Sequence, residues 1–196
     1  MANANKVHFG LKNVHYAVIT YSSTGVPSWG TVKAVPGAVN LTLSKESGTT
    51  DFYADDIKYY HLASNNGYSG TLEMADFPVT MRQDLWNQTT STTGKLLIED
   101  VTAQPAEFAL LFEVDGDQSP ERYCFYRCLA DRPDVTGATK ADSVEVQTVS
   151  CDLSVMPVID PTTSSPINGK VYYRTTADTP SATYTSFYSS VLTTLA

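Results

Sequence analysis

The sequence is poor in basic residues and in charge altogether. Lys and Arg total 13 against 21 Asp and Glu, which gives a formal charge of -8 over 196 residues. Charged residues make up 17% of the chain, where about 25% is usual for soluble domains. No run of basic residues interrupts this pattern. Because nucleic acid is held by clustered Lys and Arg that displace its counterions, stable binding to DNA or RNA is not expected.

Segments that direct a chain out of the cytoplasm or into a membrane are also missing. No apolar stretch with a basic flank opens the sequence, as a secretion signal requires. No run approaches the ~20 apolar residues that a membrane-spanning helix needs. We therefore expect a soluble protein made in a reducing cytoplasm, with no membrane partner.

Cysteine and histidine are scarce, and their spacing suits the core better than a metal site. Only three cysteines occur. Cys124 and Cys128 lie four apart, which on a strand predicts one shared face and a separation too long for a disulfide. They are expected to be small core residues. The three histidines show no metal-ligand spacing, so no metal or cofactor is expected.

The local signatures of common catalytic sites are missing as well. Gly94-Lys95 matches only the end of a phosphate-binding loop, because Thr89 stands where the first glycine belongs. Neither a G-x-S-x-G elbow nor an H-E-x-x-H motif occurs. Carboxylate pairs such as Glu99-Asp100 could in principle serve a glycosidase, but adjacent side chains on a strand point to opposite faces. The sequence predicts that the protein is not an enzyme.

Short aromatic and β-branched runs, separated by Gly, Asn, Asp and Ser, fill the chain. The densest is Asp51–Tyr60, enclosed by the strand-like segments 37–43 and 66–73. Such runs predict successive antiparallel strands and hairpins. A chain of 196 residues is long enough for one all-β domain with a sizeable core. We divide it into an N-terminal arm at 1–12, a β-sandwich core at 13–160 and a Thr- and Ser-rich C-terminal extension at 161–196.

Individual elements can be placed from hydrophobic periodicity and turn residues. Leu41 and Leu43 alternate with polar residues, which indicates a half-buried strand. Pro78–Trp86 has partial helical spacing behind a proline and predicts one short helix packed on the sheet. The end of the chain, 184–196, fits either a short helix or a strand. The strand candidates are 13–20, several between 32 and 75, 95–101, 106–114, 122–129 and 143–158, the last with a phase change at 147–149 that predicts a β-bulge or a crossing between sheets.

Trp29 lies in a segment, 21–31, whose Gly, Pro and Ser content predicts a loop. Two interpretations stay open for the indole: it plugs the edge of its own sandwich, or it anchors on another subunit, as exposed loop tryptophans often do. Phe9 and Tyr21 are further candidates for inter-subunit contacts.

Asp51, Asp55 and Asp56 form an acidic trio in the densest hairpin. They could be a solvated edge whose charges discourage wrong strand pairing. They could also line an assembled channel, where repeated carboxylates form a negative wall that DNA slides past without adhering.

Several of these motifs, in this order, resemble a family. The chain is similar to the major tail protein, the tail-tube subunit of long-tailed bacteriophages that infect Gram-positive bacteria. The resemblance rests on residues 5–17 (Asn5-Lys6-Val7, then Phe9-Gly10-Leu11-Lys12-Asn13-Val14-His15-Tyr16-Ala17), 36–43, 51–55 (Asp-Phe-Tyr-Ala-Asp), 66–70 (Asn-Gly-Tyr-Ser-Gly), 108–113, 126–128 and 132–133. It covers roughly residues 5 to 160; the segment after Asp160 departs from the pattern.

The resemblance implies a β-sandwich with a flanking helix that joins into hexameric rings, which stack into the hollow tail tube. The tubes of contractile injection systems share this plan. It further implies a location in the virion tail, bridging of successive rings by the arm and a long loop, and partners in the tape-measure, tail-terminator and distal tail proteins. DNA would pass through during ejection without specific binding. Two other functions suit an acidic all-β chain: a carbohydrate-binding or decoration module on a virion, and a carboxylate-dependent glycan hydrolase.

Overall fold

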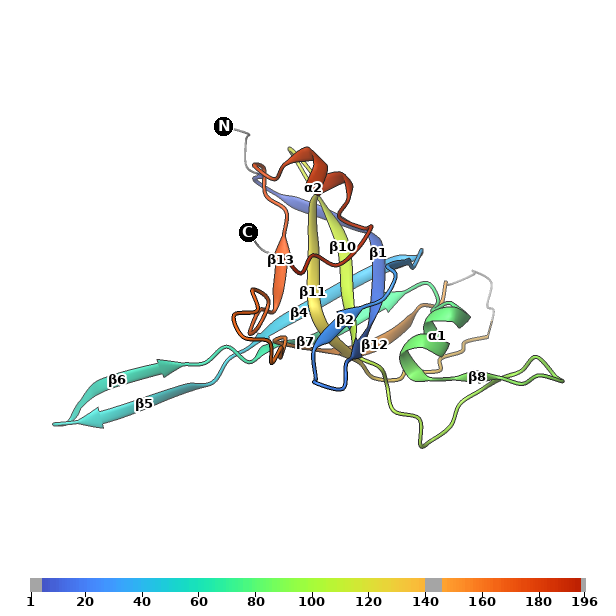
Figure 1. Ribbon diagram of the computed structural model, residues 1–196, viewed down its shortest axis with the longest axis horizontal. Coiled ribbons are helices and arrows are strands. Elements are labelled where there is room, and N and C mark those ends of the chain that lie inside the picture. Colours follow the sequence, from blue (N-terminus) through green and yellow to red (C-terminus); the bar gives the residue numbers. More distant parts are fainter. Residues whose placement is uncertain (1–4, 140–145, 195–196) are drawn as a thin grey trace.

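The computed structural model describes residues 5–139 and 146–194, and one antiparallel sheet of nine strands dominates it (Figure 1). The main strand order is β2-β1-β10-β11-β12-β7-β4, with β3 beside β1 and β13 beside β11. The sheet strands are β1 (His8–Tyr21), β2 (Pro27–Trp29), β3 (Lys33–Ala34), β4 (Ala38–Glu46), β7 (Gly67–Met74), β10 (Phe108–Gly116), β11 (Glu121–Ala130), β12 (Val149–Met156) and β13 (Tyr172–Arg174). Two small hairpins lie outside it, β5 (Thr49–Ala54) with β6 (Ile57–Ala63), and β8 (Thr89–Thr90) with β9 (Leu97–Ile98).

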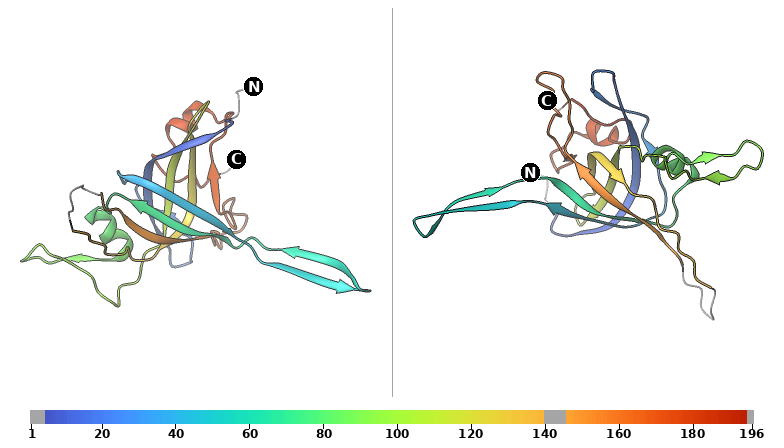
Figure 2. Two further views of the ribbon diagram at one scale, coloured as in Figure 1. Left: turned by 180° about the vertical axis from the view of Figure 1, so that it is seen from behind. Right: turned by 90° about the horizontal axis from the view of Figure 1, so that it is seen from below.

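The sheet folds over on itself, so that β4 and β7 form a second layer that crosses β1, β10 and β11 (Figures 1 and 2). The main core fills the space between these two layers. Its fully buried members come from both layers and include Tyr16, Leu72, Phe108 and Leu110. The all-β, sandwich-like fold expected from the alternating pattern is confirmed.

The short helix α1 (Val79–Trp86) closes one end of this core. Met81, Leu85 and Trp86 are buried, and the indole N–H of Trp86 donates to the carbonyl oxygens of Ala130 and Asp131 at 3.1 and 2.9 Å. The predicted helix at 78–86 is therefore present. Asn87 ends it in the left-handed conformation, with φ of 51°.

A second core lies on the outer face of β1, β10 and β11, beneath the C-terminal segment. Ile167, Phe187 and Val191 of that segment cover Leu111 and Tyr126. The segment contains α2 (Ser181–Thr185), which overlaps the ambiguous stretch 184–196 only at Tyr184 and Thr185. Neither the helix nor the strand considered for that stretch forms in residues 186–194. The predicted extension is thus part of the fold.

A nearly buried ion pair fastens this segment. Arg122 donates to the carboxylate of Glu113 at 2.6 Å, and the Glu113 side chain is 4% exposed. The Arg122 guanidinium lies 3.8 Å from the ring centre of Tyr184 and donates to the Tyr184 carbonyl oxygen. One arginine therefore joins the sheet to the C-terminal segment through charge, a hydrogen bond and a cation–π contact.

Several boundaries differ from the sequence-based expectation. β1 begins at His8, five residues before the expected Asn13, so residues 8–12 of the predicted arm are strand. Asn5 is also held to the body, because its amide donates to Ser119 O at 2.8 Å. The predicted loop at 21–31 contains β2, whose Trp29 pairs with Ile19. The phase change at 147–149 coincides with the start of β12 at Val149 instead of a bulge inside a strand. Residues 143–145 of the predicted strand 143–158 lie outside the described part.

Cys124 and Cys128 lie on opposite faces of β11, so the predicted shared face is wrong. Cys124 belongs to the outer core and Cys128 to the main core. The reason is a register shift in the pairing with β10, where Phe108 faces Cys128 but Leu110 faces Phe125. The extra residue on β11 reverses the alternation, as a β-bulge does. Cys151 joins the main core, and all three thiols are free and buried, as expected for core residues.

We expect Gly70→Ala to destabilise the sheet. A methyl group at Gly70 would lie 1.8 Å from the Thr42 carbonyl oxygen of β4, whereas one at Gly137 meets nothing within 4 Å. Since backbone must move to relieve the clash, the free energy of unfolding should fall by roughly 3 kcal/mol. Urea unfolding of both variants measures this. Equal stability of Gly70→Ala and Gly137→Ala would contradict the described packing of β4 on β7.

We also expect stability to fall in mildly alkaline solution. Burial raises the pKa of Cys124 and of Cys151 to about 12, whereas an unfolded cysteine has a pKa of about 8.5. Below pH 8.5 the thiols are protonated in both the folded and the unfolded chain, so the folded state keeps its full stability. As the pH rises from 8.5 toward 12, the unfolded chain loses these protons more readily, and the free energy of unfolding falls. Between pH 8 and 9.5 the loss should reach about 1 kcal/mol per thiol. Urea midpoints should show a smaller loss for Cys124→Ala, and a midpoint independent of pH would contradict the burial.

Candidate assembly surface

The hairpin β5–β6 projects from the body as a continuation of β4 and β7 (Figures 1 and 2). Backbone hydrogen bonds carry the pairing across the junction, from Asn66 N to Glu46 O and from Ser64 N to Gly48 O, both 2.8 Å. Six residues of β5 at about 3.3 Å each reach roughly 20 Å into solvent. Asp55 and Asp56 form the turn with φ of 53° and 62°, the left-handed values of the type I′ turn that suits a two-residue hairpin.

One face of this hairpin is apolar although it is exposed. Residues opposite each other in a hairpin share a face, and the pairs on this face are Phe52 with Tyr60, Thr50 with Leu62 and Ala54 with Ile57. We call Phe52, Ile57, Tyr60 and Leu62 the apolar hairpin face. Their exposed fractions are 58, 62, 59 and 53%.

The opposite face of the same hairpin is charged. Asp51 lies across from His61, and Lys58 across from Tyr53. Lys58 Nζ lies 2.7 Å from Asp51, and the His61 ring N–H donates to the other Asp51 oxygen. Hydrogen bonds from His61 and, to a smaller extent, from Lys58 lower the pKa of the Asp51 carboxyl. The charged side chains of this face are thus paired with each other. The large side chains of the apolar hairpin face, in contrast, remain exposed to solvent.

The three aspartates of the acidic trio lie in two different places on the hairpin. Asp51 is paired on the charged face, while Asp55 and Asp56 occupy the turn, where Asp tolerates positive φ better than most residues. The lining of a channel by these carboxylates stays a prediction.

The basal strand of the hairpin, β4, lies at the end of the sheet order. In the described ranges it pairs with β7 on one side and with no strand on the other. Nine residues of edge strand are thereby available for pairing with another chain. Because β4 runs directly into the exposed hairpin β5–β6, the two form one continuous surface that could contact another chain.

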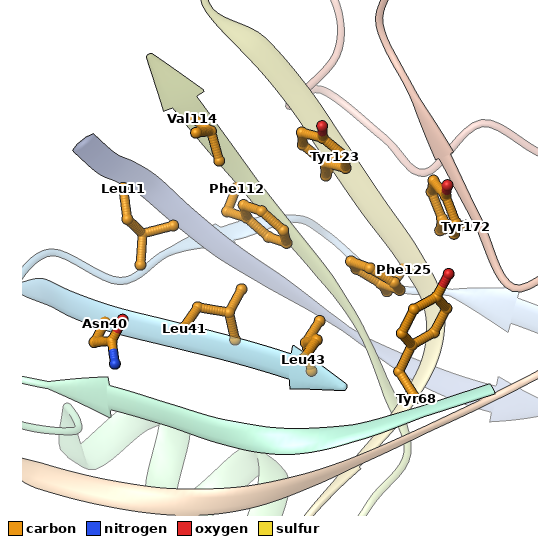
Figure 3. A pocket seen from close by; sticks show the side chains of 10 residues that line it. All are labelled: Leu11, Asn40, Leu41, Leu43, Tyr68, Phe112, Val114, Tyr123, Phe125 and Tyr172. Carbon is orange, nitrogen blue, oxygen red and sulfur yellow. The ribbon is translucent and has the colours of Figure 1, made fainter. Parts of the chain in front are cut away.

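An apolar groove opens between the two layers of the sheet beside β4 (Figure 3). It has a volume of about 360 Å³. Leu41 and Leu43 point from β4 toward Phe112 and Phe125 on the opposite layer, and Tyr68 stands at one end (Figure 3). The complete lining is Leu11, Asn40, Leu41, Leu43, Tyr68, Phe112, Val114, Tyr123, Phe125 and Tyr172.

The other three contact candidates lie apart from this surface. Phe9 is 58% exposed near the start of β1, opposite Asp115. Tyr21 ends β1, and its hydroxyl donates to Glu107. The Trp29 indole packs in the outer core and donates to Tyr126 O at 2.9 Å, a position that fits the edge-plug alternative. Contact of Phe9, Tyr21 or Trp29 with another subunit stays a prediction.

Sequence reasoning placed the hairpin but missed the groove. Its walls come from six strands, and Tyr172 belongs to a segment interpreted as an extension. The alternation of Leu41 and Leu43 was the one available signal, and it indicated a buried face without showing that the face stays partly open.

Among residues 5–139 and 146–194, His, Cys, Asp and Glu side chains form no cluster of three or more that could hold a metal ion. Within the same residues, neither helix has the length and apolar content to cross a membrane.

We expect the substitutions Asp55→Asn and Asp56→Gly, made together, to preserve the hairpin, because Asn-Gly is a preferred type I′ turn. Isoleucine at both positions should disorder it, since β-branched residues are strained at positive φ. Cross-strand contacts between Ala54 and Ile57 in nuclear Overhauser spectra distinguish the two variants. If both variants keep these contacts, the turn does not depend on the two aspartates.

Neither a known protein family nor a curated protein matches this sequence. Among solved structures, the chain is similar to a chain of the anti-feeding prophage baseplate, determined by cryo-electron microscopy with 6-fold symmetrisation. The two share 15% sequence identity with a TM-score of 0.42, over 79% of this chain and 93% of that one.

Proposed function

We propose that this chain is a structural virion protein that assembles with copies of itself into hexameric rings, stacked as a phage tail tube. The observation that carries the proposal is the apolar hairpin face, which stands clear of the body on a continuation of an unpaired edge strand. The tail-tube resemblance of residues 5–160 supports the same function.

The exposed side chains of the hairpin would gain free energy from burial in an assembly. Covering a large apolar side chain stabilises a complex by about 1.5–3 kcal/mol, and the apolar hairpin face presents four of them on one side of a ribbon. A two-stranded hairpin is marginally stable by itself in water. Burial against a partner would therefore stabilise residues 49–63, because the body of their own chain does not cover them.

The unpaired edge of β4 also favours assembly. A long unpaired edge invites indiscriminate pairing, and closure into a ring removes it. Contacts between two different surfaces of a chain close a ring when the rotation fits, and rings then stack through another interface. The β4 edge suits the ring contact, and a projection of roughly 20 Å suits a contact with a neighbour farther away.

The proposed tube passes DNA without holding it. A net charge of -8 per chain, repeated around a ring, favours repulsion of phosphate over adhesion. In this function the chain is not an enzyme, needs no cofactor and is located in the virion tail after synthesis in the bacterial cytoplasm. Its partners are its own copies, the tape-measure protein inside the tube, and the terminator and distal tail proteins at the tube ends.

Negative-stain microscopy of concentrated protein tests this function. Wild-type protein should form rings or tubes of uniform width. Phe52→Ser with Leu62→Ser should leave the fold intact and abolish the assemblies. Lys58→Ser with His61→Ser, on the charged face of the same hairpin, is the matched control and should assemble normally.

Monomeric wild-type protein at high concentration would contradict the proposal. Retention of such monomers on immobilised glycans would instead favour a carbohydrate-binding module, for which the exposed Phe52 and Tyr60, on one face of the hairpin, would be the platform.

A further inference from the structure

We propose that the apolar hairpin face of one copy docks into the groove beside β4 of another copy. This inference rests on the proposed self-assembly and specifies the surface that receives the hairpin. It makes the contact heterologous, since the two surfaces that meet are different parts of the chain.

The groove and the hairpin match in chemical character. Eight of the ten lining residues are Leu, Val, Phe or Tyr from the main core and its margin, besides Tyr172 and Asn40. The rings of Phe112 and Tyr123 are stacked at 5.3 Å, and Tyr172 lies 5.1 Å from Phe125. An incoming Phe52 or Tyr60 would extend this aromatic group, and such pairs are worth about 0.5–1.5 kcal/mol beyond their buried area.

Size and hydrogen bonding fit as well. A volume of about 360 Å³ gives room for a few large side chains but not for a folded domain. The hydroxyls of Tyr68 and Tyr172 provide polar groups among the apolar walls, whereas that of Tyr123 already donates to Glu121 at 3.0 Å (Figure 3). Buried tyrosine hydroxyls need hydrogen-bond partners, and the hydroxyl of an incoming Tyr60 provides one.

Charge favours the same partner. Lys45 lies on β4 opposite Tyr68, on the face that also carries Leu41 and Leu43. The hairpin ends in two consecutive acids, Asp55 and Asp56. An acidic tip that approaches a lysine at the end of the groove gains a modest attraction at the rim, where such pairs contribute mainly to orientation and association rate.

The hairpin of the same copy does not fill this groove. It continues β4 and β7 outward, away from the layers that form the groove, in each of the views (Figures 1 and 2). Each copy therefore offers one unfilled groove and one uncovered hairpin, which is the arrangement needed for open-ended addition of copies.

Site-directed cross-linking tests the contact. One preparation carries Phe52→Cys, and a second carries Asn40→Cys or Tyr172→Cys, at different points of the groove. The native cysteines give little background because all three are buried. After co-assembly and treatment with a short bismaleimide, we expect covalent dimers from Phe52→Cys with at least one groove variant. The matched control, Tyr53→Cys on the charged face, should give at least 10-fold less dimer.

The other outcomes overturn the inference in distinguishable ways. Normal assemblies without hairpin–groove dimers would leave the proposed function intact and refute the groove as the receiving surface. Dimers from Phe52→Cys alone would indicate a hairpin–hairpin contact and refute the heterologous arrangement. Absence of any assembly under the microscope would refute both this inference and the proposed function.

Discussion

The pairing of β4 with β7 is the constraint on which the rest of the structure depends. Along its inner half, this strand pair forms one layer of the sandwich, where Leu72 and Met74 enter the core. Along its outer half, the same pair continues as β5 and β6 without a body to cover it. Gly70 permits the close approach of the two strands, because a side chain there would overlap the Thr42 carbonyl. The pairing of β4 with β7 therefore sets the direction in which the hairpin projects from the body.

Two polar features keep the remainder of the fold in place without taking part in this surface. The Arg122–Glu113 pair ties the C-terminal segment to the outer face of β10 and β11. The Trp86 indole ties α1 to the end of β11 through two carbonyl oxygens. Each satisfies buried donors or acceptors at a place where apolar packing alone would leave them without partners. Neither contact involves the apolar hairpin face, which lies outside the body.

The sequence permitted prediction of the all-β fold, α1 and the hairpin at 51–60, because these depend on local periodicity and turn residues. It did not permit prediction of the groove or the second core, which depend on contacts between segments far apart in the chain. The cysteines show the limit clearly. Strict alternation puts Cys124 and Cys128 on one face, and a single extra residue in β11, visible only against its partner strand, separates them. Likewise, Asp51 appears in the sequence as part of an acidic cluster, but its cross-strand partners Lys58 and His61 satisfy it.

Hydrogen exchange of residues 49–63, followed by mass spectrometry across a range of protein concentrations, tests the central idea most directly: that this ribbon is completed by other copies. The account predicts fast exchange in dilute protein, as for a two-stranded hairpin open to solvent, and strong protection at concentrations where assemblies form, while β10 and β11 are protected throughout. Exchange in the ribbon that stays equally fast in the assembled protein would contradict the account.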